Sequence, residues 1–314
     1  MTTNNIYVDR TTTWHAIGKD VQECTDMAQV LRKSGLDYTV EKRPIWTYPD
    51  VEDSGERMVI PNRFITTRKE DGHTYDVVSD KFEIVQNTEA FDFVNYMGDE
   101  IQFEKAGETA SGMVYIIAKL PDVDILGDKF TPHVIFRNGF SGKVKITAAI
   151  APLRLVCQNQ FNFAFKNAQN TISIRHVQNA EAKLQEARDT LKLSADYMAE
   201  LTRTAEHFAA IKMTPERIER VTNILFPMPE GVEMNAFKGA TLENARNRFL
   251  LAHEAKDNAN FRGTAWGLIN AYTDFITHKE PAKTKTGVNF EGRFVNTTFK
   301  VNMNPIMTAI EMVQ

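Results

Sequence analysis

The sequence has few cysteines and no long apolar run. Its two cysteines among 314 residues, Cys24 and Cys157, form no CxxC pair and have no clustered histidines, so neither a disulfide framework nor a zinc site is indicated. No run approaches the roughly 18 apolar residues of a membrane helix, and residues 1–10 contain no apolar signal core. We therefore expect a protein of the cytoplasm with no membrane partner.

The common catalytic motifs are also missing. The chain contains no GxGxxG, Walker loop, HExxH or GxSxG, the patterns that usually accompany dinucleotide binding, nucleoside triphosphate hydrolysis, zinc proteolysis and serine hydrolysis. No cofactor or metal is indicated, and a non-enzymatic role is favoured. The composition, 42% hydrophobic and 25% charged, is that of a globular protein.

Acidic residues are absent from one long stretch. Residues 129–180 contain seven Lys or Arg and no Asp or Glu, although the whole chain has 41 acidic residues; at that average the window would carry about seven. The rest of the chain has 30 basic and 41 acidic residues. A positive segment therefore lies within a negative chain.

Phenylalanines alternate with these cations, among them Phe140 and Phe161. Positive charge beside exposed rings is what a protein needs to follow a phosphate backbone and stack bases. Burial of the rings in the core is the alternative interpretation. The predicted nucleic-acid-binding residues are Arg137, Lys143, Lys145, Arg154, Lys166, Arg175, Phe140 and Phe161.

The patterns predict an α+β fold, with antiparallel sheets and packed helices in the N-terminal half and a helical C-terminal half. Strands are expected at 113–120, 134–136 and 143–150, with a hairpin after Asn138-Gly139. A helix is expected at 155–166, and such a unit would bring the basic side chains to one groove. A turn is expected at Asp71-Gly72 and a helix at 88–97. Apolar residues at helical spacing continue from Leu184 to Phe208, and a further helix is expected to start at Thr214-Pro215. We divide the chain into an α+β domain, 1–178, and a helical region packing on it, 179–314.

Two polar clusters have more than one interpretation. Asn270, Asp274 and His278 share one face of a predicted helix, where they form either a catalytic group or a solvated stripe. The three aspartates around Gly127 (Asp122, Asp124 and Asp128) could hold a cation or form a turn. The spacing of these aspartates does not match a calcium-binding loop.

Five phrases of the sequence resemble one known family. They occupy residues 14–18 (WHAIG), 77–86 (VVSDKFEIVQ), 152–159 (PLRLVCQN), 174–176 (IRH) and 263–271 (GTAWGLINA). In this order they are similar to the phage/plasmid-like family of domain of unknown function 932. The resemblance implies an early or replication-associated protein of a bacteriophage or plasmid, acting in the host cytoplasm, but implies no activity. The order of strands and helix in 113–166 is also similar to that of single-strand annealing recombinases, which is a fold-level analogy.

The leading hypothesis is a non-enzymatic nucleic-acid-binding protein that binds or anneals single-stranded DNA as a homo-oligomer. Annealing breaks no bond and needs a surface that holds the backbone while base edges stay free.

A second hypothesis is an enzyme or a binder of a phosphorylated small molecule. Its site would combine Arg154 and Arg175 with other residues of the family-like phrases: Trp14, His15, Asn159, His176, Trp266 and Asn270. A third is an assembly protein whose basic stretch meets an acidic neighbour.

Overall fold

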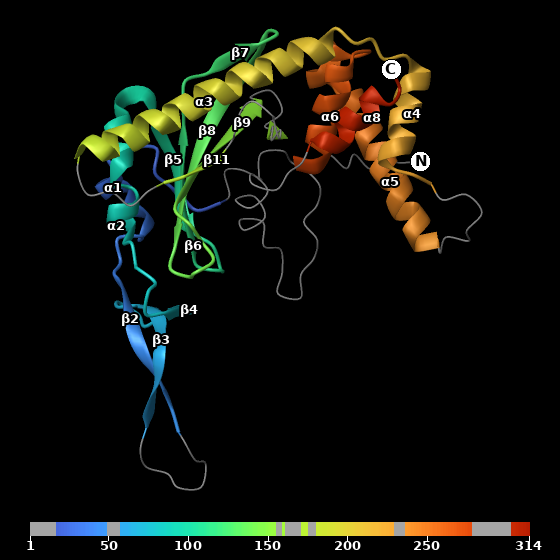
Figure 1. Ribbon diagram of the computed structural model, residues 1–314. Helices are drawn as coiled ribbons and strands as arrows, with labels where there is room; N and C mark the ends of the chain where they lie inside the picture. Colours follow the sequence, from blue (N-terminus) through green and yellow to red (C-terminus); the bar gives the residue numbers. More distant parts are fainter. Residues whose placement is uncertain are drawn as a thin grey trace.

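A computed structural model shows an antiparallel sheet covered by a long helix, with a helical bundle at one end and a narrow ribbon projecting from the other (Figure 1). The structure describes residues 17–48, 57–154, 159–160, 171–174, 180–228, 236–277 and 303–314. Antiparallel sheets in the N-terminal half and helices in the C-terminal half confirm the predicted α+β class.

The main sheet is antiparallel and contains eight of the described strands, six of them in the order β1-β5-β6-β8-β9-β10, with β11 pairing β9 and β7 pairing β8. The strands are β1 (Lys19–Asp20), β5 (Gln102–Glu108), β6 (Met113–Lys119), β7 (Val123–Ile125), β8 (Asp128–Gly139), β9 (Thr147–Arg154), β10 (Asn159–Gln160) and β11 (Thr171–Ser173).

The predicted hairpin is confirmed in its pairing, because β8 and β9 are antiparallel with Arg137 opposite Thr147. Its turn is not at Asn138-Gly139: both residues belong to β8 and pair with Val114 and Met113 of β6, and the loop covers residues 140–146. The helix predicted at 155–166 is wrong at Asn159 and Gln160, which pair with β9 as a strand. The backbone there satisfies its hydrogen bonds at the sheet edge rather than within a helix. The rest of that prediction lies outside the described residues.

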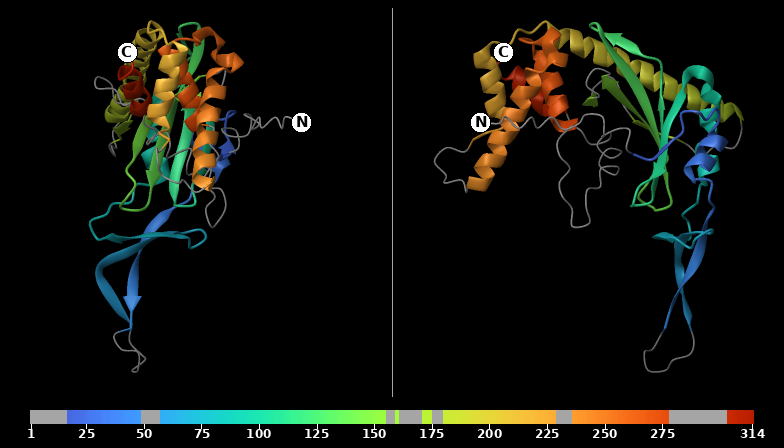
Figure 2. Two further views of the ribbon diagram at one scale, coloured as in Figure 1. Left: turned by 90° about the vertical axis from the view of Figure 1, so that its right-hand side faces the viewer. Right: turned by 180° about the vertical axis from the view of Figure 1, so that it is seen from behind.

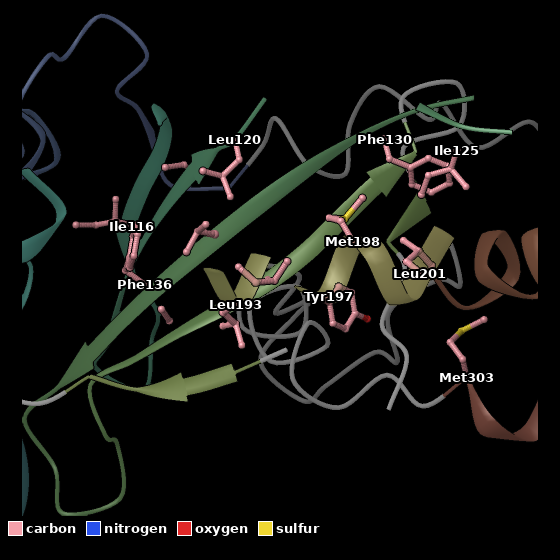
Figure 3. Packing of buried hydrophobic residues seen from close by; sticks show 14 of the residues in the cluster. Ile116, Leu120, Ile125, Phe130, Phe136, Leu193, Tyr197, Met198, Leu201 and Met303 are labelled. Atoms are coloured by element: carbon pink, nitrogen blue, oxygen red, sulfur yellow. The ribbon is translucent and has the colours of Figure 1, made fainter. Parts of the chain in front are cut away.

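Helix α3 (Ala180–Ala209) lies across one face of the sheet. Leu193, Tyr197 and Leu201 of α3 belong to the same buried cluster as Phe130 and Phe136 of β8 (Figure 3). Residues with the opposite orientation, such as Tyr115 and Ile135, form a second, smaller buried cluster. Successive side chains of a strand point to opposite faces, so both faces of the sheet are apolar at its centre.

The remaining helices form two groups. Near the sheet are α1 (Met27–Ser34), α2 (Asn87–Ala90) and the 3-10 helix η2 (Asp92–Glu100). The single helix predicted over 88–97 is therefore divided between α2 and η2. At the other end of α3 is a bundle, best seen in Figure 2, of α4 (Pro215–Leu225), α5 (Ala236–His253), η3 (Lys256–Phe261), α6 (Ala265–Thr277) and α8 (Asn304–Glu311). The predicted start of α4 is confirmed: the Thr214 side chain accepts a hydrogen bond from Arg217 N, and Pro215 is the first residue of the helix.

None of the described helices is long and apolar enough to cross a membrane.

A second, three-stranded sheet contains β2 (Val40–Thr47), β3 (Met58–Arg68) and β4 (Thr74–Ser79) in that order. The turn predicted at Asp71-Gly72 joins β3 to β4, and Gly72 adopts a left-handed φ of 75°. Beyond β4, strands β2 and β3 continue away from the body (Figures 1 and 2). We call residues 40–48 and 57–68, which are β2 and β3 with Tyr48 and Arg57 beside them, the ribbon.

Candidate nucleic-acid interface

Lys143 and Lys145 lie on the loop between β8 and β9, and both are exposed. The Lys143 side chain is 84% exposed, and its Nζ lies 3.2 Å from an Asp76 carboxylate oxygen of β4. A hydrogen bond from the Val77 backbone N–H and the nearby Lys143 ammonium lower the pKa of Asp76. An acidic residue from outside the carboxylate-free stretch therefore faces one of its cations, while Lys145 points to solvent.

Arg137 is less available than the sequence suggested. It lies on β8, where its Nε donates to Thr147 Oγ1 at 3.2 Å and its Nη1 approaches the Met113 sulfur at 3.7 Å. Burial lowers the pKa of Arg137 to about 10, which leaves the guanidinium charged at neutral pH. Its place on the sheet makes it a poor first contact for a phosphate.

Of the other predicted cations, the structure describes only the backbone of Arg154. The backbone of Arg154 lies opposite Phe130, at the far end of β9 from Thr147, a separation of about 23 Å at 3.3 Å per residue. Its side chain lies outside the described residues, as do Lys166, Arg175 and Phe161. The expected convergence on one groove is therefore wrong for the backbone positions of Lys143 and Arg154, because the pairing of β8 with β9 places them at opposite ends of the sheet.

Phe140 does not have the exposed ring that base stacking requires. It is 1% exposed, and its ring lies 5.9 Å from the Tyr38 ring and 5.1 Å from the Tyr75 ring. Phe130 and Phe136 are fully buried. Burial of these rings is favourable because it removes apolar surface from water, and the prediction that Phe140 stacks bases is corrected to a core role.

The β8–β9 loop joins the base of the ribbon. The Thr66 hydroxyl of β3 donates to the Phe140 carbonyl oxygen at 2.7 Å, close to where Lys143 meets Asp76. The ribbon carries exposed cations of its own, Arg43, Arg57 and Arg63. Lys143 and Lys145 are therefore next to a second basic element.

The basic character of the ribbon was not predicted from the sequence, although a charge signal is present. Residues 42–48 and 57–68 contain five Lys or Arg and no acid, but residues 49–56 between them contain four acids. A sequence window long enough to include both strands also includes these four acids, so its net charge is close to zero. Only their pairing shows that the basic segments are neighbours in space.

A buried polar pair was also missed. His133 of β8 and Glu104 of β5 are 3% and 8% exposed, with His133 Nε2 3.0 Å from Glu104 Oε2 and Nδ1 3.0 Å from the Thr131 carbonyl oxygen. A carbonyl oxygen can only accept, so Nδ1 is the donor to Thr131. The two residues are 29 positions apart, and no spacing rule connects them.

The alternative ligand site is partly assembled by the fold. Trp266 and Asn270 of α6 are 0% and 1% exposed, and α6 packs against β10, which contains Asn159. Asn270 Nδ2 donates to the Trp266 carbonyl oxygen at 2.9 Å, whereas Asn270 Oδ1 has no hydrogen-bond partner among the described residues. Trp14, His15 and His176 lie outside the described residues.

The two polar clusters weighed from the sequence show structural roles where they are visible. Asp122 accepts from the Thr131 hydroxyl at 2.7 Å, and Asp124 accepts from Gly127 N at 2.9 Å, which closes the turn. Across the described part of the chain, no group of three His, Cys, Asp or Glu residues could hold a metal ion. Asp274 is half-buried on α6, and His278 follows the last described residue of that helix.

Comparison with known families gives one match. Residues 74–294, most of the chain, match the model of a family described as a domain of unknown function (DUF932). The chain belongs to this family. No curated protein and no solved structure matches it. The family resemblance expected from the five phrases is thereby confirmed, and since the description names no activity, function has to be argued from the residues.

Proposed function

We propose that this protein binds nucleic acid without enzymatic activity, and that its role is to bind and anneal single-stranded DNA during phage recombination or replication in the bacterial cytoplasm. The observation that carries the proposal is the absence of carboxylates from residues 129–180, together with the exposure of Lys143 and Lys145 on one loop. Phosphate contacts by such cations supply most of the affinity of a sequence-independent binder. Several copies along one strand would hold its bases free for pairing.

The test is a fluorescence-anisotropy titration of a labelled thirty-nucleotide oligothymidine at several salt concentrations. We expect log affinity to fall linearly with log salt, because bound cations release counterions. The double variant Lys143→Ala, Lys145→Ala should reduce the magnitude of that slope by up to about 1.4, or about 0.7 for each phosphate contact on a single strand. Lys143 contributes its full share only if it leaves Asp76.

The matched control is Arg188→Ala with Lys192→Ala, which removes two exposed cations from α3. It should leave the slope unchanged. Binding that does not depend on salt, or equal loss in both double variants, contradicts the proposal.

One observation favours a second candidate, a binder of a small phosphorylated molecule or nucleotide. Asn270 Oδ1 is buried and has no partner in the part of the chain that the structure describes. An unsatisfied buried acceptor costs about 1–3 kcal/mol unless a ligand or water satisfies it. Thermal-shift measurements with mononucleotides and with the same oligothymidine separate the candidates. Stabilisation by mononucleotides alone supports this second function, and a salt-sensitive oligomer without affinity for either ligand supports an assembly role.

A further inference from the structure

The ribbon exposes large apolar side chains that a folded chain normally covers. Trp46 is 53% exposed, Tyr48 59% and Met58 55%. Trp46 pairs with Val59, itself 41% exposed, across the two strands. Exposed apolar groups gathered on one projecting element mark a binding surface more often than isolated ones do.

Cations lie near these rings along the same two strands but on the other face, because Arg43 and Trp46 are three positions apart on β2 and successive side chains of a strand alternate between faces. Arg43 pairs with Ile65, and Arg63 lies two residues before Ile65, so Arg43 and Arg63 are diagonal neighbours on one face of the ribbon. Val77 of β4, 52% exposed, also pairs with Ile65 and shares this face. Phe64 and Thr66 alternate with these residues and point to the other face, on which Thr66 contacts the β8–β9 loop.

The described strands of the ribbon contain one acid, and it is already engaged. Glu41 lies 2.8 Å from Arg43 Nε and 3.7 Å from Lys69 Nζ. Arg57 donates from Nε to the Tyr48 hydroxyl at 3.3 Å, which adds no negative charge. The four acids of residues 49–56 belong to the segment between the strands. The face with Arg43 and Arg63 is therefore complementary to an anionic partner.

We infer that the ribbon is a second contact surface for single-stranded nucleic acid, with Trp46 stacking on a base and Arg43 and Arg63 neutralising phosphates. This inference rests on the proposed function. The β8–β9 loop contacts the face of Thr66, so Arg43 and Arg63 form a surface separate from that of Lys143 and Lys145, on the opposite face of the same strands. A single strand is the partner because unpaired bases offer their faces to an aromatic ring, whereas a duplex would leave the exposed rings of Trp46 and Tyr48 unused. The strands of the ribbon, about 26 Å for the eight residues of β2, are long enough to contact several nucleotides.

The experiment uses the full chain and the same labelled oligothymidine. Trp46→Ala should weaken binding about 5- to 100-fold, the range of one base-stacking contact, while Trp46→Phe, which keeps an aromatic face, should retain most of the affinity. Arg43→Ala with Arg63→Ala should reduce the magnitude of the salt slope by about 1.4. Addition of oligothymidine should quench part of the tryptophan emission of the wild type, and Trp46→Phe should remove that part of the change.

Two control variants match these changes elsewhere on the surface. Leu251→Ala removes a side chain that is 71% exposed, and Arg188→Ala with Lys192→Ala removes two cations from α3. Neither should change binding. Thermal melting should be the same for wild type and Trp46→Ala, because the ring makes few buried contacts.

The outcomes separate this inference from the proposed function. If the wild type binds oligothymidine and the ribbon variants match their controls, the ribbon is not a contact surface, although the proposed function stands. If the wild type binds no nucleic acid, both fail. Tighter binding of a thirty-base-pair duplex than of the single strand overturns the choice of partner. A Trp46→Ala variant that changes the oligomeric state in size-exclusion chromatography but not the affinity for oligothymidine makes the ribbon a self-association surface instead.

Discussion

Asp76 shows how one residue limits the charge that the β8–β9 loop presents. Its carboxylate lies between the Val77 N–H, at 2.8 Å, and the Lys143 ammonium, at 3.2 Å. Both interactions favour the ionised form, and the pKa of Asp76 is lowered from its ordinary value of 3.8. A carboxylate with a lowered pKa in the folded state stabilises the fold above pH 3.8, and this contribution is lost as the pH falls through the lowered value.

We therefore expect Asp76→Asn to be less stable than the wild type at pH 7 by less than about 1 kcal/mol, because Lys143 is largely exposed. The difference should disappear as the pH falls below 3.8, where the wild-type carboxyl becomes protonated as well. Urea unfolding at pH 7 and at acidic pH measures both values. In the anisotropy assay, the same variant should bind oligothymidine more tightly than the wild type, since Lys143 loses a competing anion. Weaker binding would contradict the role given to Lys143.

At the scale of single elements, α6 packs closely against η3. A Cβ added at Gly267 would lie 2.2 Å from the Phe261 carbonyl oxygen. The Gly267 carbonyl also accepts a hydrogen bond from Asn258 Nδ2 at 2.9 Å. The glycine of the phrase GTAWGLINA is therefore needed for helix packing, whatever else that phrase does.

Gly267→Ala should destabilise the protein by about 2 kcal/mol or more, the effect of overpacking against backbone. This is the reverse of the intrinsic preference, since alanine favours a helix over glycine by about 1 kcal/mol. Gly142→Ala is the control, because no described atom beyond its two chain neighbours lies within 4 Å of a Cβ added there, and it should change stability by less than about 0.5 kcal/mol. Equal urea midpoints for the two variants would show that η3 moves aside.

At the scale of the whole molecule, the boundary predicted at residue 178 separates the sheet from the helix that covers it. Leu193, Tyr197 and Leu201 of α3 share one buried cluster with the strands (Figure 3). That cluster also includes Trp266 and Met303 of the C-terminal bundle. The two predicted parts are therefore joined by one continuous core among the described residues.

A fragment of residues 1–178 should consequently expose the α3-facing side of the sheet and aggregate or bind a hydrophobic dye. A fragment of residues 1–212 keeps α3 and is the matched control; we expect it to remain more soluble and to bind less dye. Size-exclusion chromatography with dye fluorescence compares the two. A soluble, cooperatively melting 1–178 fragment would show that the sheet does not need α3.

Patterns local in sequence predicted local structure well. Thr214-Pro215 predicted the start of α4, and Asp71-Gly72 predicted the turn between β3 and β4, because caps and turns depend on residues a few positions apart. Asn138-Gly139 predicted a hairpin whose strands are present, but the two residues lie in β8 because they pair with β6. The helix at 155–166 was wrong at Asn159 and Gln160, since apolar spacing in a short segment does not distinguish a helix from a strand whose partner is elsewhere in the chain. Candidate site residues were harder to predict because the exposure of a side chain depends on what packs against it. The sequence around Phe140 does not show whether its ring faces solvent or, as observed, packs against Tyr75.

The amino-acid sequence by itself determined the α+β class, the family and the separation of charge between residues 129–180 and the rest, since composition and periodicity need no knowledge of neighbours. Only the tertiary structure decided which charges are available. Strand pairing placed Asp76 against Lys143, positioned Arg43 beside Arg63 and left Trp46 exposed. These contacts are between residues far apart in the chain, or they depend on which residues pack nearby. Electrostatic and stacking interactions depend on the distance between groups in space, which the sequence alone does not give.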